Sequence, residues 1–335
     1  MNKIRFAIVG FGHIGKRHAE MIARNPDAEL IAICDTNTDV LQSHSEAKTY
    51  SDYQALLQNE RSNIEVVCIC TPNGLHAEMS NKAIQAGYHV LIEKPLGLSK
   101  KNCEEVIYNA FNEDKQVFCV MQNRYSPPSQ WLKQLVESKV LGDIYMVQLN
   151  CFWNRDDRYY KPGGWHGDKT LDGRTLFTQF SHFIDVMYWL FGDIDNIHSR
   201  FFDFNHQEST QFEDSGVIHF DFVNGGVGSL NFTTSVYDKN QESSITIIGE
   251  NGSVKVGGQY MNEVEYCHIK DYTMPKLDPV NPANDYGAFK GSAANHVYVI
   301  QNVIDVLNGK GRKTTNALEG LKVVDIIERM YNAKQ

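Results

Sequence analysis

A glycine pattern near the N-terminus has the spacing that a bound dinucleotide requires. Gly10-Phe11-Gly12-His13-Ile14-Gly15 follows an apolar run at 4–9 and precedes a stretch with helical periodicity. Glycine at position 10 permits a tight turn, at 12 lets a pyrophosphate approach the backbone, and at 15 allows close helix packing. The helix N-terminus adds a partial positive charge. We therefore expect residues 10–15 to bind the phosphates of a dinucleotide.

Asp35 indicates which dinucleotide this is. It ends the second apolar run, 20 residues after Gly15, where a carboxylate can accept a hydrogen bond from an adenosine ribose 2′-hydroxyl and repel a 2′-phosphate. This spacing favours NAD over NADP. A glycine-rich turn with a capping aspartate is the plainer alternative, and the strand and helix context argues against it.

Two further places combine groups that titrate or form hydrogen bonds. Lys94, in Glu93-Lys94-Pro95, follows an apolar run and so lies at the carboxyl edge of a predicted sheet, where open α/β folds bind ligands. Thr178, His182 and Asp185 have the spacing of one face of a helix predicted over 175–191. Asp185 would either orient the His182 imidazole or pair elsewhere in the scaffold. The plainer alternatives are a surface lysine and a core histidine.

The elements that position these residues form two domains. Strands are predicted at 3–9, 28–34, 65–70, 88–93 and 116–121, with amphipathic helical stretches between them. This α/β alternation predicts a doubly wound parallel sheet of the Rossmann type. Two adjacent prolines, Pro127-Pro128, end any regular element. We place the boundary just before them, with an NAD-binding domain over 1–122 and a substrate-binding domain over 123–335.

The second domain is predicted to be α+β. The helix at 175–191 is followed by β-rich runs from 194 to 270, and helical patterns at 292–308 and 316–333 close the chain. Asn224-Gly225-Gly226 and Glu250-Asn251-Gly252 are typical of hairpin turns. We therefore expect a large, open and mostly antiparallel sheet.

The composition argues against several partners and sites. A net charge of -9 and a pI near 5.7 disfavour nucleic acid and anionic membranes. No signal-peptide pattern and no membrane-length apolar run occur, which predicts a soluble cytoplasmic protein. The seven cysteines are an odd number, and Cys68 and Cys70 alternate across a strand, so we expect buried thiols and no metal site.

Three motifs in order give the chain a resemblance to a known family. With the glycine pattern, Thr71-Pro72-Asn73-Gly74-Leu75-His76 and Glu93-Lys94-Pro95, it resembles the glucose-fructose oxidoreductase, inositol dehydrogenase and MocA (Gfo/Idh/MocA) family over nearly its whole length. The resemblance implies an NAD-dependent dehydrogenase with Lys94 and His182 as catalytic residues, and a cis Lys94-Pro95 bond. Besides residues 10–15 and Asp35, the expected cofactor contacts are Thr71, Pro72, Asn73, His76, Glu93, Lys94 and Gln122.

One position departs from the family pattern. The family has an aspartate four residues before its histidine, and here Thr178 stands four residues before His182. A threonine does not ionise near neutral pH, so acid-base work would rest with Lys94 and His182. Thr178 would only orient a substrate hydroxyl or carbonyl, which disfavours inositol-type substrates.

The loop at 153–167 narrows the resemblance to one branch. It is rich in aromatic and cationic residues, which suit a nucleotide-linked sugar, although a subunit contact would also explain them. With Gln122-Asn123-Arg124 and residues 244–250, it resembles dehydrogenases that oxidise the 3-hydroxyl of UDP-N-acetylglucosaminuronic acid for bacterial surface polysaccharides. The substrate contacts expected on this basis are Lys94, Asn123, Arg124, Arg155, Tyr159, Trp165, Thr178, His182 and His296.

Two alternatives keep the fold and change the function: a dehydrogenase of a free sugar or cyclitol, and a non-catalytic NAD-binding sensor. The family pairs open sheets between subunits, which implies a homodimer or homotetramer. The sequence leaves open whether Lys94 or His182 is the base. It also leaves open whether NADH is released or reoxidised in place by 2-oxoglutarate.

Overall fold

The chain divides into two compact units. The computed structural model describes residues 3–42, 46–287 and 289–333. The first unit runs to Met121 and includes His296–Val324; the second contains Gln122–Asn295 and the residues from Asp325 onward. The division after Met121 lies beside the predicted boundary, but residues 296–324, which we expected in the second domain, group with the first. No helix in the described ranges is both long and apolar enough to cross a membrane.

The first unit contains a six-stranded parallel sheet in the order β3-β2-β1-β4-β5-β6. This is the strand order of a dinucleotide-binding Rossmann domain, so the predicted sheet is confirmed. Its strands are β1 (Ile4–Val9), β2 (Ala28–Cys34), β3 (Lys48–Tyr50), β4 (Val66–Ile69), β5 (His89–Ile92) and β6 (Val117–Cys119). The sequence did not predict β3, because it has only three residues and two of them are exposed.

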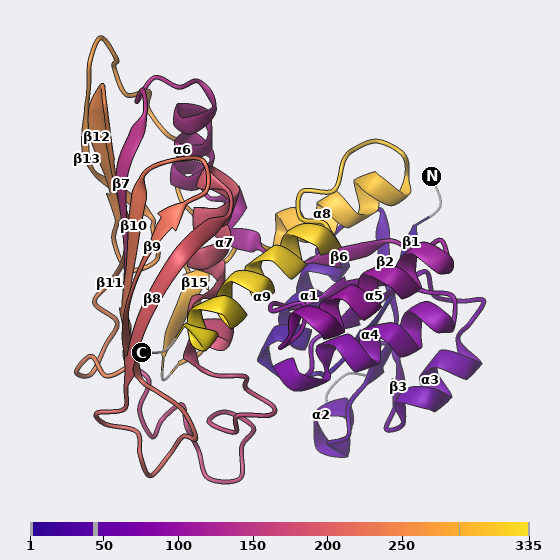
Figure 1. Ribbon diagram of the computed structural model, residues 1–335. Helices are drawn as coiled ribbons and strands as arrows, with labels where there is room; N and C mark the ends of the chain where they lie inside the picture. Colours follow the sequence, from indigo (N-terminus) through magenta and orange to yellow (C-terminus); the bar gives the residue numbers. More distant parts are fainter. Residues whose placement is uncertain (1–2, 43–45, 288, 334–335) are drawn as a thin grey trace. The chain divides into compact units, whose positions relative to one another are not determined.

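Helices connect these strands (Figure 1). They are α1 (His13–Arg24), α2 (Thr38–Gln42), α3 (Tyr53–Asn59), α4 (His76–Gln85) and α5 (Lys100–Asn112), with a short 3-10 turn at Asn73–Leu75. Strands β4 and β5 are apolar and almost wholly buried, as expected of strands covered on both faces. The parallel order brings the carboxyl ends of β1, β4 and β5 to one edge of the sheet, and each end is followed by one of the three sequence motifs.

The second unit contains a seven-stranded sheet in the order β13-β12-β11-β7-β10-β9-β8. Only β7 and β10 pair in parallel, so the prediction of a mostly antiparallel sheet is confirmed. The strands are β7 (Ile144–Phe152), β8 (Ile194–Phe202), β9 (Ser215–Phe222), β10 (Val227–Thr233), β11 (Glu242–Gly249), β12 (Gly252–Gly257) and β13 (Glu263–Ile269). A separate hairpin joins β14 (Ala283–Asp285) to β15 (Lys290–Ala293).

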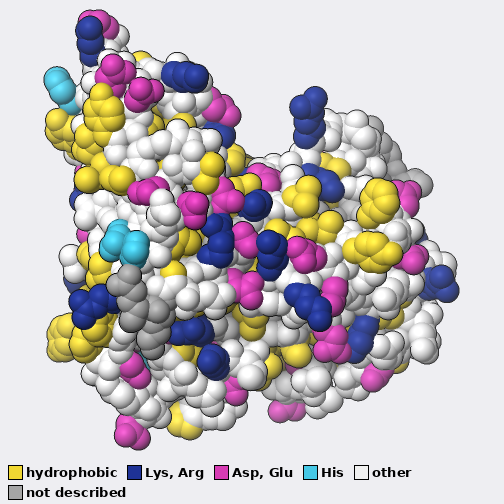
Figure 2. Space-filling model, in the orientation of Figure 1, with side chains coloured by type: hydrophobic (Ala, Val, Ile, Leu, Met, Phe, Trp, Pro, Cys, Tyr) yellow, Lys and Arg dark blue, Asp and Glu magenta, His cyan; other side chains and the backbone are white. Residues whose placement is uncertain are grey.

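One face of this sheet packs against helices. Helices α6 (Pro127–Glu137) and α7 (Ser181–Phe191) lie on the same side of it (Figure 1). Along β7, Val147, Leu149 and Cys151 are buried while Met146 and Gln148, which alternate with them, are exposed, as a half-covered strand requires. Figure 2 shows hydrophobic side chains interspersed with charged ones on the side of the molecule where Figure 1 draws β7 to β13.

The helix predicted over 175–191 is regular only in its second part. Leu176–Phe180 forms a π-helical turn, and the α-helix α7 begins at Ser181. The Thr178 hydroxyl donates to the main-chain carbonyl of Asp172, six residues earlier, which draws this segment away from the regular hydrogen-bond ladder. The predicted arc of Thr178, His182 and Asp185 assumed an ideal helix and is wrong in that respect. Two helices complete the chain, α8 (His296–Leu307) and α9 (Ala317–Asn332).

Candidate active site

The glycine turn has the geometry that its sequence pattern predicts. Gly10 has a φ of +87°, and a Cβ there would lie 2.5 Å from the Cys70 carbonyl oxygen, so this position admits only glycine. A Cβ on Gly15 would lie 2.1 Å from the Gly10 oxygen, because helix α1 packs directly against the turn. A Cβ on Gly12 would meet nothing within 4 Å. Gly12 therefore faces open space at the N-terminus of α1, where a pyrophosphate can approach.

Asp35 lies directly against this turn. It follows β2, and its Oδ2 accepts a hydrogen bond of 2.6 Å from the Phe11 N–H, while Oδ1 accepts one of 2.8 Å from the Asn37 N–H. The carboxylate is thus fixed beside the glycine turn by two main-chain donors. This is the placement that an adenosine ribose contact requires.

The loop after β4 adds a buried hydroxyl to the same sheet edge. Thr71 Oγ1 is buried and has no hydrogen-bond partner among the described residues. A buried hydroxyl without a partner is costly unless a ligand satisfies it. This hydroxyl and the open space at Gly12 fit a bound NAD, to which these residues would provide a hydrogen bond and a close backbone approach.

His76 does not have the exposure of a cofactor contact. Its side chain is buried, its Nδ1 lies 2.7 Å from the Pro95 oxygen, and its Nε2 lies 2.8 Å from the Thr71 oxygen. Burial lowers the pKa of this imidazole, although both carbonyl oxygens favour its protonated form. His76 therefore joins the loop after β4 to the Glu-Lys-Pro loop, and Asn73, in the 3-10 turn, is also buried.

The Glu-Lys-Pro loop follows β5. The Lys94-Pro95 bond is cis, as the family resemblance implied. Lys94 is half-buried, and its main-chain N–H donates to Glu93 Oε2 over 3.3 Å. Glu93 Oε1 lies 2.8 Å from His18 Nε2 and 3.6 Å from His296 Nε2, and all three side chains are buried. The structure thus places His296, an expected substrate contact, beside Glu93 within the first unit.

In the second unit, the catalytic candidate His182 is the second residue of α7 and is buried. Thr178 lies in the preceding π turn, and its hydroxyl contacts both the carboxylate and the main-chain carbonyl of Asp172. The buried Asp172 carboxylate also accepts a hydrogen bond of 2.8 Å from the Gly167 N–H. The sequence analysis missed Asp172, since it lies in a loop without periodicity.

Asp185 forms a buried ion pair with Arg124. Arg124 donates from Nε over 2.8 Å and from Nη2 over 2.6 Å to the two carboxylate oxygens, and neither side chain is exposed. Of the two roles considered for Asp185, pairing within the scaffold is therefore observed. The Arg124 guanidinium forms a bidentate pair in the core, and its contact with the substrate stays a prediction.

Two neighbours of Arg124 have the features of ligand-binding residues. Asn123 is only 3% exposed, yet neither Oδ1 nor Nδ2 has a hydrogen-bond partner within the described ranges. Gln122 donates to Ser292 Oγ over 3.2 Å, and its Oε1 likewise has no partner there. Buried amides of this kind are unfavourable unless a ligand or water satisfies them. The substrate contact of Asn123 and the cofactor contact of Gln122 stay predictions, and the unsatisfied amide atoms agree with ligand binding by both residues.

The aromatic and cationic loop at 153–167 mainly packs on itself. Arg155 donates to Gln179 Oε1 (2.8 Å), to the Asn154 oxygen (2.6 Å) and to the Lys290 oxygen (3.2 Å), and burial lowers the pKa of its guanidinium. The Tyr159 hydroxyl accepts from Gln179, and its ring belongs to a buried aromatic cluster. Arg155 and Tyr159 thus form contacts within the unit, and Trp165 is half-buried. The predicted substrate contacts of all three stay predictions.

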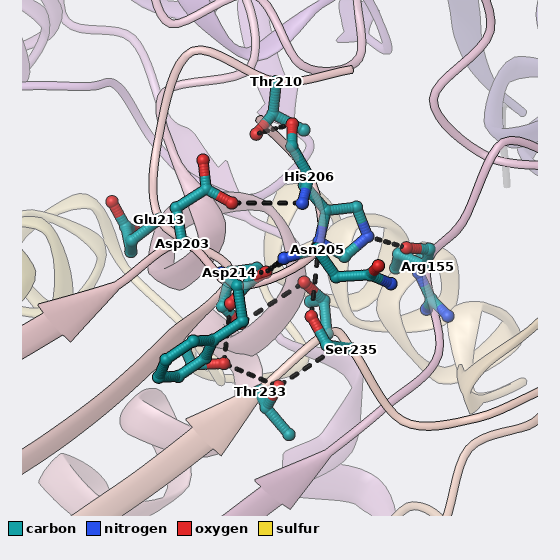
Figure 3. A network of polar contacts seen from close by, with 12 residues as sticks. Arg155, Asp203, Asn205, His206, Thr210, Glu213, Asp214, Thr233 and Ser235 are labelled. Atoms are coloured by element: carbon teal, nitrogen blue, oxygen red, sulfur yellow. Dashed lines mark hydrogen bonds and ion pairs between the residues drawn. The ribbon is translucent and has the colours of Figure 1, made fainter. Parts of the chain in front are cut away.

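A polar network fixes the start of this loop (Figure 3). His206 Nε2 contacts the Arg155 oxygen, and its Nδ1 lies 3.1 Å from Asp214 Oδ2. Burial opposes the charge on both side chains, but the pairing outweighs it, raising the pKa of His206 and holding the pKa of Asp214 well below its usual range. Asp214 Oδ2 also accepts from the N–H groups of Phe204 and Asn205. The network is a scaffold for the loop.

Family comparisons agree with both units. Residues 4–121 match an oxidoreductase family with an NAD-binding Rossmann fold, and residues 129–255 match the Gfo/Idh/MocA C-terminal domain. The chain belongs to the Gfo/Idh/MocA family. It is an NAD-dependent dehydrogenase of that family.

Two solved structures are similar over nearly the whole chain. The WlbA dehydrogenase from Bordetella pertussis, in complex with NADH and UDP-GlcNAcA, is 32% identical, covers 99% of this chain and 96% of its own, and has a TM-score of 0.87. The WlbA dehydrogenase from Chromobacterium violaceum, in complex with the same two molecules, is also 32% identical over 99% of this chain and 94% of its own, with a TM-score of 0.88.

A curated relative names a different substrate. D-glucoside 3-dehydrogenase from Escherichia coli is 32% identical over 149 residues, which are 43% of this chain and 42% of that protein. This similarity covers less than half of either protein, whereas the two WlbA dehydrogenases are matched along nearly their whole length.

Proposed function

We propose that the protein oxidises the 3-hydroxyl of UDP-N-acetylglucosaminuronic acid to the 3-keto sugar nucleotide, on a route to bacterial surface polysaccharides. The observation that carries this proposal is the full-length similarity, at 32% identity, to two dehydrogenases that were solved with NADH and UDP-GlcNAcA. Lys94, His182 and the unsatisfied amide of Asn123 support it. We also propose that the protein acts in the cytoplasm.

The chain supplies two groups for the proton that leaves the 3-hydroxyl. Lys94 follows the sheet edge where the glycine turn lies, and His182 begins the buried helix α7. Either one, in its neutral form, would accept the hydroxyl proton. When bound, NAD supplies the hydride acceptor. We propose that Asn123 binds a polar group of the sugar and holds the reacting carbon in place.

A second function is favoured by the D-glucoside 3-dehydrogenase similarity. In that alternative the substrate is a free sugar or glycoside without a nucleotide. Arg155 and Tyr159, two residues expected to bind the nucleotide, are occupied within the second unit, which removes one argument against it.

A substrate panel separates the two functions. The purified protein would be incubated with NAD and with UDP-GlcNAcA, UDP-N-acetylglucosamine, methyl glucoside or inositol, and kcat/KM would be measured from NADH absorbance. The proposal predicts a preference for UDP-GlcNAcA of at least about 100-fold, because a site with buried polar groups that bind a substrate rejects analogues that leave those groups unpaired. A higher kcat/KM for the glucoside would reject the nucleotide-sugar assignment. Parallel reactions with 2-oxoglutarate, followed by product mass, would reveal NADH that is reoxidised in place.

We also propose a homodimer or homotetramer formed through the large sheet. Val227, Met146 and Ile248 are cross-strand neighbours on β10, β7 and β11, and their side chains are 46%, 51% and 37% exposed. These three residues, the sheet patch, lie on the face opposite the buried Val147 and Leu149. A second copy would bury this apolar surface.

A further inference from the structure

A buried carboxylate stands directly before the proposed catalytic lysine. Glu93 is 7% exposed, and each of its oxygens contacts protein groups. Oε1 lies 2.8 Å from His18 Nε2 and 3.6 Å from His296 Nε2, and Oε2 accepts from the Lys94 N–H over 3.3 Å. Glu93 is thus turned into the unit, although its motif led us to expect a cofactor contact.

The two histidines reach Glu93 from different helices. His18 belongs to α1, the helix that the glycine turn opens, and His296 is the first residue of α8. Their rings meet edge to face, with centroids 5.7 Å apart. The cluster therefore ties the peptide of Lys94 to both helices, while His76 holds the next residue, Pro95, by its carbonyl oxygen.

The two histidines hold Glu93 differently, because His18 forms a hydrogen bond with it, whereas His296 Nε2 lies 3.6 Å away and forms no hydrogen bond within the described ranges. A metal ion bound by two imidazoles would require an acceptor for the second nitrogen of each ring. The Nδ1 atoms of His18 and His296 have no such partner among the described residues. Burial disfavours the charge on Glu93, yet contacts with His18 and His296 outweigh it and hold the pKa of the carboxyl well below its usual range.

We propose that Glu93 is a positioning residue for Lys94, with His18 and His296 holding its carboxylate in place. This inference rests on the proposed catalytic role of Lys94. Glu93 fixes the main chain from which the lysine side chain extends, and it places a buried negative charge one residue before the lysine. The titratable groups near Glu93 are His18 on α1, Cys68 and Cys70 at β4, His76 on α4, His296 on α8 and Lys94 itself, and Arg17 on α1 acts on His296.

Competitive acetylation tests the charge effect without requiring turnover. The full-length protein would react with a trace of acetic anhydride from pH 6 to pH 11, and the labelling of the Lys94 peptide would be measured by mass spectrometry. In Glu93→Gln the pH of half-maximal labelling falls by about one unit, because a neighbouring negative charge is lost. Glu60→Gln, which removes another buried carboxylate of the same unit, bound by Lys48 and Tyr50, leaves it unchanged. An unchanged value in Glu93→Gln would overturn the inference.

Kinetic and binding measurements test the positioning. Glu93→Gln is expected to lower kcat by roughly 10- to 100-fold, while the Kd for NADH, from fluorescence, changes less than about threefold because the Glu93 carboxylate is engaged by His18 and the Lys94 N–H. His18→Gln retains an N–H donor and most of the activity, whereas His18→Leu behaves like Glu93→Gln. A large rise in the Kd for NADH with an unchanged kcat would instead make Glu93 a cofactor ligand.

The labelling of Lys94 and the assay of UDP-GlcNAcA oxidation together distinguish a failure of this inference from a failure of the proposed function. If the wild-type protein does not oxidise UDP-GlcNAcA but Lys94 labelling still shifts in Glu93→Gln, the substrate assignment fails and the positioning role stands. If the wild-type protein is active and the labelling does not shift, the positioning role fails and the proposed function stands.

Discussion

The family pattern has an aspartate at the position of Thr178, and in this protein the carboxylate of Asp172 contacts the Thr178 hydroxyl. The Thr178 hydroxyl donates its hydrogen to Asp172, so only its lone pairs remain available to a ligand. The sequence analysis allowed Thr178 to orient either a hydroxyl or a carbonyl, and this contact favours the hydroxyl. A substrate donor fits this position, whereas a carbonyl oxygen would meet a second acceptor.

Substituting Thr178 tests this direction. In Thr178→Val, kcat/KM for the preferred substrate is expected to fall by about 10-fold, because a substrate hydroxyl loses its acceptor. Thr178→Ser keeps the hydroxyl and is expected to stay within about threefold of the wild-type value. Steady-state assays with both variants decide the matter, and equal losses would indicate a packing effect of the methyl group.

Lys94 and His182 differ in what their removal does to the pH profile. Lys94→Met and His182→Gln are each expected to lower kcat by roughly 10²- to 10⁴-fold, the usual contribution of a general acid or base. The substitution that removes the base also removes the acidic limb of the kcat/KM profile. Residual activity would be assayed from pH 5 to 10. Wild-type kcat in either variant would exclude that residue from catalysis.

Among individual residues, the sequence predicted local backbone features correctly, namely the glycine turn and the cis Lys94-Pro95 bond. It also predicted that Asp35 follows the second strand. It did not predict the buried partners of Arg124, Arg155 and Tyr159, because Asp185 and Gln179 are distant in sequence. A buried arginine and a ligand-binding arginine are identical in a sequence. Only the tertiary partner distinguishes them.

Among the secondary-structure elements, the turn between β1 and α1 contains one glycine that folding requires and another that cofactor binding requires. Gly12 and Gly15 belong to one motif, but only Gly15 is packed against protein atoms. Gly12→Ala is expected to leave the melting temperature nearly unchanged and to weaken NAD binding at least about 10-fold, because the methyl group occupies the phosphate approach. Gly15→Ala is expected to lower the melting temperature, since its Cβ would contact the Gly10 oxygen.

Calorimetry and NADH titration of both variants test this separation. Destabilisation by Gly12→Ala, or unchanged NADH affinity in that variant, would contradict the geometry of the turn.

The segment that contains His206 predicts a pH-dependent stability. Because the pKa of His206 is raised, its stabilisation is complete below about pH 6.5 and is lost as the pH rises through the raised pKa. The pKa of Asp214 is lowered, so its contribution is present above about pH 4 and is lost as the pH falls through the lowered value. The melting temperature should therefore decline on both sides of mildly acidic pH.

A histidine substitution checks the alkaline side of this prediction. In His206→Gln the decline between pH 6 and pH 8 should become smaller, whereas His268→Gln, at an exposed position of β13, should leave the wild-type curve unchanged. Melting curves that keep their full alkaline decline in His206→Gln would refute the role of this ion pair.

The elements themselves were largely predictable. Apolar runs and hairpin turns placed both sheets, since burial and turn chemistry act locally. The three-residue β3 and the π turn at Leu176–Phe180 were not predictable, because pairing with β2 forms the first and a side-chain contact with Asp172 accompanies the second.

At the scale of the whole molecule, chain order did not predict the two units fully. Residues 296–324 return to the first unit, where α8 packs against α1 and the segment before α9 bonds to β6. This return places His296 beside Glu93. No local pattern in residues 296–324 identifies the unit to which they belong, since an amphipathic helix fits either core.

The sheet patch predicts the state of association. Met146→Glu is expected to shift the protein toward monomers in light scattering, because a charge within an apolar interface is unfavourable. Phe111→Glu, at an exposed position of α5, serves as the control and should not change the mass. Wild-type protein that is already monomeric at micromolar concentration would contradict the proposed assembly.

Isotope labelling at carbon 3 of the sugar tests directly whether the enzyme oxidises the 3-hydroxyl of UDP-GlcNAcA. The enzyme would be incubated with NAD and UDP-GlcNAcA that contains deuterium at carbon 3 of the sugar, and the sugar nucleotide would be examined by mass spectrometry. Oxidation at carbon 3 predicts a product that has lost one hydrogen and one deuterium, with the deuterium transferred to NADH. A product that retains its deuterium, or no product at all, would contradict it.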